Sequence, residues 1–208
     1  MSAAARLFSD AVARFMPARK HENIRILAAS GSMLLIALAG AGAAARPTTQ
    51  QPARAPDIYF TGTPQPVVKA MLSLARVTAD DIVYDLGSGD GRVVVIAAQT
   101  YGARGVGIEI QPHLVEVSRQ IARAGAVADK VTFLEGDLFT ADISEATVVT
   151  LWLSEGVNAR LEPKLRSELR PGTRIVSHQF PIGRWPPDET RHADDDQTDL
   201  FLWTVPAR

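Results

Sequence analysis

Short apolar runs alternate with amphipathic segments over residues 57–208. Runs of the length and composition of buried strands are found at 82–86, 105–110, 131–135, 147–153 and 174–180. Apolar positions at helical spacing predict helices over 63–77, 91–100, 112–125 and 157–169. A strand that is followed by a helix and then by another strand forms a parallel pair, because the helix provides the crossover. The pattern therefore predicts an α/β fold with helices on both faces of a mostly parallel sheet.

The pattern changes at the end of the chain. Two further strand-like segments, 189–192 and 200–205, flank the polar run ADDDQTD. Strands on either side of a polar loop are typical of an antiparallel hairpin. We therefore expect a Rossmann-like sheet of seven strands that closes with a C-terminal antiparallel hairpin.

The N-terminal quarter of the chain has a different character. Residues 26–45 carry no charge and are long enough to cross a bilayer as a helix, and the basic region 1–25 precedes them. A Pro-rich linker, 46–56, follows and leads to the domain over 57–208. The small residues AGAAA at the end of the apolar run resemble a signal-peptide cleavage site, so we expect either a membrane anchor or a cleaved signal.

These features also predict where the protein is located. The basic N-terminus should stay in the cytoplasm, which places the domain outside the membrane as an anchored or exported (periplasmic) protein. A mitochondrial presequence is the alternative interpretation of the Arg- and Ala-rich first 20 residues. We rank a single N-terminal membrane anchor first.

Composition and charge exclude several classes of function. Lys and Arg number 22 against 23 Asp and Glu, so the chain offers no overall cationic field for nucleic acid. The absence of cysteine excludes disulfides, thiolate metal sites and a cysteine nucleophile. No spacing of histidines or clustered carboxylates suggests a metal site, and we expect none.

The segment VYDLGSGDGR, residues 83–92, carries the strongest chemical signal. An apolar strand ends at Asp85 and continues through Gly87, Ser88, Gly89 and Gly91 into a helix, so the backbone can approach a ligand closely. A dinucleotide fingerprint has the spacing G-x-G-x-x-G, whereas the third glycine here comes one residue early and an acid precedes the first. Asp85 can face an ammonium group, which a pyrophosphate lacks. The predicted ligand is a cationic amino acid joined to a nucleoside.

Two further acids follow the next two predicted strands. Glu109 ends GVGIEI, where a carboxylate can accept both ribose hydroxyl groups. Asp137 lies in FLEGDLF and can accept a hydrogen bond from an adenine amino group, with Leu138 and Phe139 as apolar cover. The carboxyl ends of neighbouring parallel strands form one crevice, so the three acids should line one site.

Together these motifs resemble the class I S-adenosylmethionine-dependent methyltransferases. The wider set DIYFTGTPQPVVKAML, VYDLGSGDGR, YGARGVGIEI, ATVVTLWLSEGVN, LRPGTRIVSHQF and WPPD is similar to the lysine methyltransferases of ATP synthase c-subunit and adenine nucleotide translocase and their bacterial relatives. The resemblance implies S-adenosylmethionine as cofactor and a protein lysine as methyl acceptor. It assigns the methionine part to Asp85, Gly87 and Gly89, the ribose to Glu109 and the adenine to Asp137.

The chain departs from the family pattern on the acceptor side. Phe60-Thr61-Gly62-Thr63 stands where the family tends to have Tyr-x-Pro-Thr, and Ser154-Glu155-Gly156 where it tends to have Leu-Pro-Glu. Small-molecule N- or O-methylation and a membrane-tethered binding module without turnover therefore remain alternatives. TLWLSEG lacks the Asn-Pro-Pro-Tyr pattern used on adenine or glutamine acceptors.

The acceptor channel is predicted from aromatic and polar residues near the strand ends. Methyl transfer needs alignment and exclusion of water, and an apolar channel favours the neutral form of a lysine. The aromatic candidates are Trp152, Tyr59, Phe60 and Phe180. The polar groups expected to face the acceptor are Glu155, Asn158 and His178. We expect a monomer that acts on an accessible lysine of a protein, with membrane proteins among the candidates.

Overall fold

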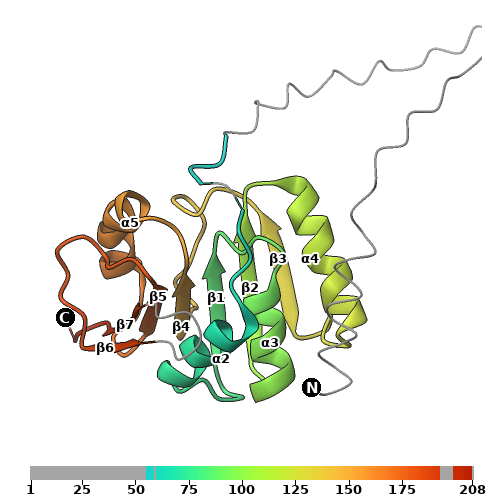
Figure 1. The fold of residues 1–208 in the computed structure, drawn as a ribbon, viewed down its shortest axis with the longest axis horizontal. Helices are drawn as coiled ribbons and strands as arrows, with labels where there is room; N and C mark the ends of the chain where they lie inside the picture. Colours follow the sequence, from blue (N-terminus) through green and yellow to red (C-terminus); the bar gives the residue numbers. More distant parts are fainter. Residues whose placement is uncertain (1–54, 59, 193–198, 208) are drawn as a thin grey trace, which may run out of the picture.

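The computed structural model describes residues 55–58, 60–192 and 199–207, and these form one seven-stranded sheet with the order β3-β2-β1-β4-β5-β7-β6 (Figure 1). The strands are β1 (Ile82–Leu86), β2 (Arg104–Glu109), β3 (Val131–Glu135), β4 (Val148–Leu151), β5 (Arg174–His178), β6 (Glu189–His192) and β7 (Asp199–Thr204). β1 to β5 pair in parallel, and β7 pairs antiparallel with both β5 and β6. The predicted sheet and its closing hairpin are confirmed.

Two apolar clusters cover the two faces of the sheet. The helices are α2 (Gln65–Leu74), α3 (Arg92–Tyr101), α4 (Pro112–Ala124) and α5 (Glu155–Glu168). Alternate strand residues face opposite sides, so Val83 and Val148 pack with α2, α3 and α4, whereas Tyr84 and Val149 pack with α5. A sheet that is buried on both faces leaves its edges and strand ends for ligands.

Several elements end earlier than the sequence predicts. β4 stops at Leu151, which pairs with Leu86 on one side and Ser177 on the other, where β1 also ends. The predicted strand extensions that contain Trp152 and Phe180 therefore lie in loops at the carboxyl edge. Once the neighbouring strand ends, no ladder partner remains to extend the pairing.

A polar network fixes the opposite, amino-terminal edge of the sheet. The guanidinium of Arg174 contacts the carboxylate of Asp81 and donates to the Ala75 carbonyl oxygen at 2.7 Å. Asp81 also accepts hydrogen bonds from Thr147 Oγ1 at 2.7 Å and from the Thr78 backbone N–H at 2.8 Å. Burial raises the pKa of Asp81, but these hydrogen bonds and the Arg174 charge outweigh it and lower the pKa.

The predicted N-terminal hydrophobic helix lies outside the described residues. Residues 1–54 include the apolar run 26–45 and most of the predicted linker, and they are not described. Within the part of the chain that is described, every helix is too short or too polar to cross a bilayer.

Candidate active site

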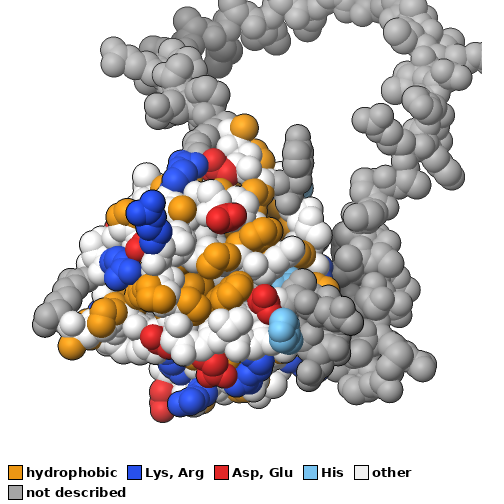
Figure 2. All heavy atoms as spheres, turned by 60° about the vertical axis from the view of Figure 1, so that its left-hand side comes forward, with side chains coloured by type: hydrophobic (Ala, Val, Ile, Leu, Met, Phe, Trp, Pro, Cys, Tyr) orange, Lys and Arg blue, Asp and Glu red, His pale blue; other side chains and the backbone are white. Residues whose placement is uncertain are grey.

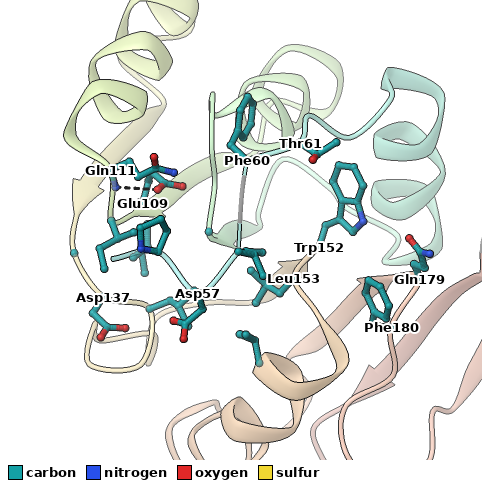
Figure 3. Close-up of a pocket in the computed structure, with 18 residues that line it drawn as sticks. Asp57, Phe60, Thr61, Glu109, Gln111, Asp137, Trp152, Leu153, Gln179 and Phe180 are labelled. Atoms are coloured by element: carbon teal, nitrogen blue, oxygen red, sulfur yellow. Dashed lines mark hydrogen bonds between the residues drawn. The ribbon is translucent and has the colours of Figure 1, made fainter. Parts of the chain in front are cut away.

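A cavity of about 260 Å³ opens at the carboxyl edge of the sheet (Figure 3). Its lining combines carboxylates, glycine-loop backbone and aromatic rings from the strand ends and from the segment before α2, including Asp57, Phe60, Gly87, Glu109, Asp137, Trp152 and Phe180. A smaller hollow of about 30 Å³ adjoins it. Phe60, Thr61, Gly87 and Trp152 line both spaces, so the two form one path beside the glycine loop.

The glycine loop adopts backbone angles that other residues rarely take. Gly87 has φ +80° and Gly89 has φ +54°, both in the left-handed region. A Cβ on Gly87 would come within 2.8 Å of the Leu153 side chain, and one on Gly89 would overlap the ring of Phe60. Gly87 therefore presents bare backbone to both hollows, whereas the ring of Phe60 lies against Gly89.

Glu109 joins the end of β2 to this loop. Its Oε2 accepts from the Gly89 N–H at 2.9 Å and its Oε1 from the Gln111 N–H at 2.9 Å. The side chain is only 6% exposed and lines the larger cavity. Each carboxylate oxygen can accept a second hydrogen bond, so the group can hold two hydroxyls while it fixes the loop.

Asp85 lies in β1, two residues before Gly87, and lines the smaller hollow. Burial, together with the charges of Asp90 and Glu109, raises the pKa of its carboxyl to about 7, although the hydrogen bond from Thr150 lowers it. Thr150 Oγ1 donates to Asp85 Oδ1 at 2.8 Å. A cationic ligand beside this carboxyl would favour its charged form.

The acidic and apolar groups on the β3 side form the other end of the cavity. Asp137 Oδ1 accepts from the Phe139 backbone N–H at 2.9 Å, and Leu138 and Ile108 line the wall beside it. The Arg160 guanidinium lies 4.1 Å above the Phe139 ring and 3.0 Å from Asp57 Oδ1. This contact links α5 to the segment that precedes α2.

Aromatic side chains form the side of the cavity opposite Glu109 and Asp137 (Figure 3). Trp152 and Phe180 are half-buried, and Phe60 is 44% exposed. The Trp152 ring packs against the His178 ring with centroids 4.8 Å apart. Tyr59, the fourth predicted aromatic residue, lies outside the described residues.

Comparison with known proteins identifies the family. The profile described as "ANTKMT methyltransferase domain" matches residues 85–189, which is half of the chain and contains the glycine loop, both strand-end acids and Trp152. The chain belongs to this methyltransferase family. The resemblance seen in the sequence is thereby confirmed, and the protein is an S-adenosylmethionine-dependent methyltransferase.

Individual relatives extend the match beyond the profile. A protein-lysine N-methyltransferase of Saccharolobus islandicus is 43% identical over 153 residues, covering 72% of this chain and 95% of that protein. The adenine nucleotide translocase lysine N-methyltransferase of Mus musculus is 34% identical over 131 residues, covering 63% of this chain and 57% of that protein. The structure of an RNA methyltransferase of Salinibacter ruber, solved with S-adenosylhomocysteine, is 55% identical in sequence and has a TM-score of 0.69. The match covers 71% of this chain and 95% of that chain.

The geometry of the methyltransferase fits its cofactor. The bare backbone at Gly87 leaves room that a side chain would fill, and the buried Asp85 carboxyl lies near the acidic Asp90 and Glu109 and accepts a hydrogen bond from Thr150. Glu109 and Asp137 lie where the ribose and the base would follow along the strand ends. Ser88 lines the smaller hollow, with its Oγ buried toward Gly107 of β2.

Several predicted site residues lie away from the cavity wall, among them Gly89 beneath the Phe60 ring. Gly91 caps α3 with φ +76°, and a Cβ there would overlap Phe133, so this glycine serves helix packing. Glu155 begins α5 with its side chain exposed, directly after the Ser154 cap. His178 is 2% exposed and lies behind Trp152 rather than on the wall.

Asn158 is also misplaced by the sequence analysis. It is fully buried on the core-facing side of α5, at helical spacing from Leu161 and Leu165. Its amide donates to the turn after β5, and the residue does not line the cavity. Because asparagine is polar, the sequence analysis expected it on the cavity wall. Its position along α5 instead directs the side chain into the core.

The sequence analysis missed an ion pair beside the glycine loop. Arg92 donates to Asp90 from Nε at 2.9 Å and from Nη2 at 2.6 Å, and its Nη1 donates to the Thr63 carbonyl oxygen at 2.9 Å. Both side chains line the smaller hollow. The pair ties the loop to the segment before α2, and the GDGR motif was its only local signal.

Gln179 was missed as well. It lines the larger cavity with φ +69°, directly after β5. No local pattern marks it, because a glutamine at a strand end reads as an ordinary surface residue.

Proposed function

We propose that this methyltransferase transfers a methyl group from S-adenosylmethionine to a lysine side chain of a protein. The observation that carries the proposal is the charge of the cavity. Asp57, Glu109 and Asp137 line the larger cavity, and no Lys or Arg of the described residues lines it. Arg92 of the smaller hollow pairs with Asp90, and Arg160 pairs with Asp57 from outside the cavity, so Glu109 and Asp137 leave the net charge negative. A cavity with this charge favours a cationic donor and a cationic acceptor and disfavours phosphate.

The cofactor contacts follow from the order of groups along the cavity. We assign the methionine ammonium to Asp85 and to the backbone of Gly87 and Gly89, the ribose hydroxyls to Glu109 and the adenine to Asp137. Charge-assisted hydrogen bonds of this kind contribute about 1.5–3 kcal/mol each. Asp85, Glu109 and Asp137 lie at or just after β1, β2 and β3, which are neighbours in the sheet. One extended ligand can therefore reach all three residues.

The cofactor supplies a methyl group on a sulfonium. The neutral lysine Nζ forms the new N–C bond, the S–CH₃ bond breaks with its electron pair going to sulfur, and the lysine proton leaves to solvent. The residues of the protein contribute alignment and a dry surface, since no dedicated nucleophile is needed.

The aromatic wall suits this chemistry. Trp152 and Phe180 offer apolar surface for the lysine methylenes and disfavour the charged ammonium, whose reference pKa is about 10.4. Ring faces also attract the methylated cation that forms. Packing on His178 fixes the orientation of Trp152 at the junction of the two hollows.

RNA is the competing acceptor class, because the Salinibacter ruber relative is described as an RNA methyltransferase. RNA binding normally uses extended basic surfaces. Figure 2 shows basic and acidic side chains interspersed on the face it presents, with hydrophobic side chains between them. The described surface in this view therefore offers less support to RNA than to a protein.

Labelling separates the acceptor classes. The full-length protein is incubated with methyl-labelled cofactor and, in parallel, with membrane proteins, soluble proteins, total RNA and a small-molecule extract. We expect label in protein, released as methyllysine on acid hydrolysis, and none with a Glu109→Ala control. Label confined to RNA or to low-molecular-mass material would refute the lysine proposal.

We also propose that residues 26–45 tether the enzyme to a membrane. Support comes from 20 uncharged residues and from the cavity position of Pro56, the last residue of the linker, and Asp57, the first residue after it. A lysine close to the membrane surface would then be within reach. Fractionation and protease accessibility in intact cells test this: recovery in the soluble fraction with an N-terminus near Arg46 would replace the tether by a cleaved signal.

A further inference from the structure

The turn after β5 holds a glutamine in an unusual conformation. Gln179 has φ +69°, and the Phe180 N–H donates to the His178 carbonyl oxygen at 2.8 Å, which closes a γ-turn around Gln179. Positive φ is uncommon for residues other than glycine, asparagine and aspartate. Such strained residues persist only when their surroundings hold them, and they cluster at functional sites.

Buried hydrogen bonds hold this turn in place. Asn158 Nδ2 donates to Ser177 Oγ at 3.1 Å and to the Phe180 carbonyl oxygen at 3.0 Å. Ser177 Oγ donates to the same carbonyl at 2.6 Å, and the Gln179 N–H donates to the Asp199 carbonyl oxygen at 2.7 Å. Asn158 is fully buried, so its hydrogen bond to Ser177 is protected from water.

The turn presents its residues to the acceptor side of the cavity. Gln179 and Phe180 line it together with Trp152, across from Glu109 and Asp137 (Figure 3). The Gln179 side chain is exposed, and its primary amide has a carbonyl oxygen that can accept from an N–H donor. Trp152 and Phe180 carry no charge, so Gln179 and Thr61 are the uncharged polar residues that the described structure places on this aromatic side, and only Gln179 offers an amide oxygen.

We propose that Gln179 recognises the acceptor, with its carboxamide oxygen accepting a hydrogen bond from the lysine amine, and that Asn158 is the residue that positions it. The assignment rests on the proposed lysine acceptor. A neutral amide orients the amine without stabilising the ammonium form, which a carboxylate would do. The nitrogen lone pair thus stays available for the methyl group.

Substitution by glycine separates recognition from structure. Gln179→Gly removes the amide but accepts positive φ, so the melting temperature should stay the same or rise. KM for the lysine acceptor should rise about threefold to tenfold, as expected for the loss of one neutral hydrogen bond, with the Kd for S-adenosylhomocysteine unchanged. An unchanged acceptor KM would overturn the assignment.

Two further variants sharpen the test. Gln179→Glu adds a carboxylate that stabilises the lysine ammonium, so the pH dependence of kcat should shift to higher pH, and an unshifted profile would count against contact with the amine. Asn158→Asp, which lacks the Nδ2 donors, should raise the acceptor KM as Gln179→Gly does. Glu168→Gln, an exposed change at the other end of the same helix, is the matched control and should alter none of these values.

The outcome for the wild type distinguishes the two proposals. A wild-type protein that labels no lysine overturns the lysine function and this assignment with it. A wild type that labels lysine, combined with a Gln179→Gly variant of equal acceptor KM, overturns only the role of Gln179.

Discussion

Replacing Asp85 by Asn should stabilise the free protein and weaken its cofactor binding. The carboxyl is 6% exposed, and burial raises its pKa from 3.8 to about 7. A shift of about three units corresponds to roughly 4 kcal/mol that the folded protein loses when this group is ionised. Asn avoids that loss but buries an amide NH₂ group, which costs about 1–3 kcal/mol of stability if it finds no hydrogen-bond acceptor. Thr150 can still donate to the amide oxygen.

The sign of the pH dependence follows from the raised pKa. The folded protein binds this proton more tightly than the unfolded chain, so the contribution to stability is fully present below pH 3.8 and is lost as pH rises to about 7. Relative to the wild type, Asp85→Asn should therefore gain about 2–3 kcal/mol in free energy of unfolding between pH 5 and pH 8. Contributions of groups that do not interact with Asp85 cancel in this difference.

Binding should change in the opposite direction. At pH 8 the wild-type carboxylate can pair with the methionine ammonium, and its loss should raise the Kd for S-adenosylhomocysteine about 10- to 100-fold. Urea unfolding at the two pH values and calorimetric titration with S-adenosylhomocysteine measure both effects. A variant that is less stable at both pH values and binds with wild-type affinity would refute this account of Asp85.

Three other substitutions test separate parts of the structure. Trp152→Ala should lower kcat about 100-fold by misaligning the acceptor, with a smaller change in Kd for S-adenosylhomocysteine, as single-turnover kinetics and calorimetry would show. Arg92→Ala frees Asp90 and the Thr63 carbonyl, so Kd for S-adenosylhomocysteine should rise and proteolysis before α2 should accelerate. Asp81→Asn should destabilise the protein by about 1.5–3 kcal/mol at pH 7 in urea unfolding, with cofactor affinity unchanged. Because the pKa of Asp81 is lowered, this difference should shrink as pH falls below 4.

The cofactor side of the site could be predicted because its signals are local. Each acid directly follows an apolar strand, and parallel strands bring their carboxyl ends to one edge. Glu109 and Gly89 are 20 residues apart in sequence and are joined by a hydrogen bond. The strand pattern alone was enough to predict that they lie close together. The glycine spacing separately indicated close approach of backbone to a ligand.

The acceptor side could not be predicted in the same way. Which way Asn158 points depends on the helix beginning at Glu155, and the conformation of Gln179 depends on contacts with Asn158 and Asp199, both some 20 residues distant. Arg92 likewise binds the carbonyl of Thr63 across 29 residues. Residue type alone suggested polar groups near the acceptor but could not separate those on the wall from those behind it.

One side of the cavity is held by buried hydrogen bonds, and the other side is more exposed. Buried hydrogen bonds from Asn158 fix the turn at Gln179, whereas Phe60 is 44% exposed and lies against Gly89. An in-line displacement needs a well-aligned acceptor, so the acceptor should bind on the side that the turn at Gln179 holds fixed. A cofactor that occupies the space over Gly89 must displace the Phe60 ring, and the segment that carries this ring is attached through Arg92 at one end and Arg160 at the other. We therefore expect cofactor exchange to move the Phe60 ring, while the hydrogen-bonded turn at Gln179 stays in place between turnovers.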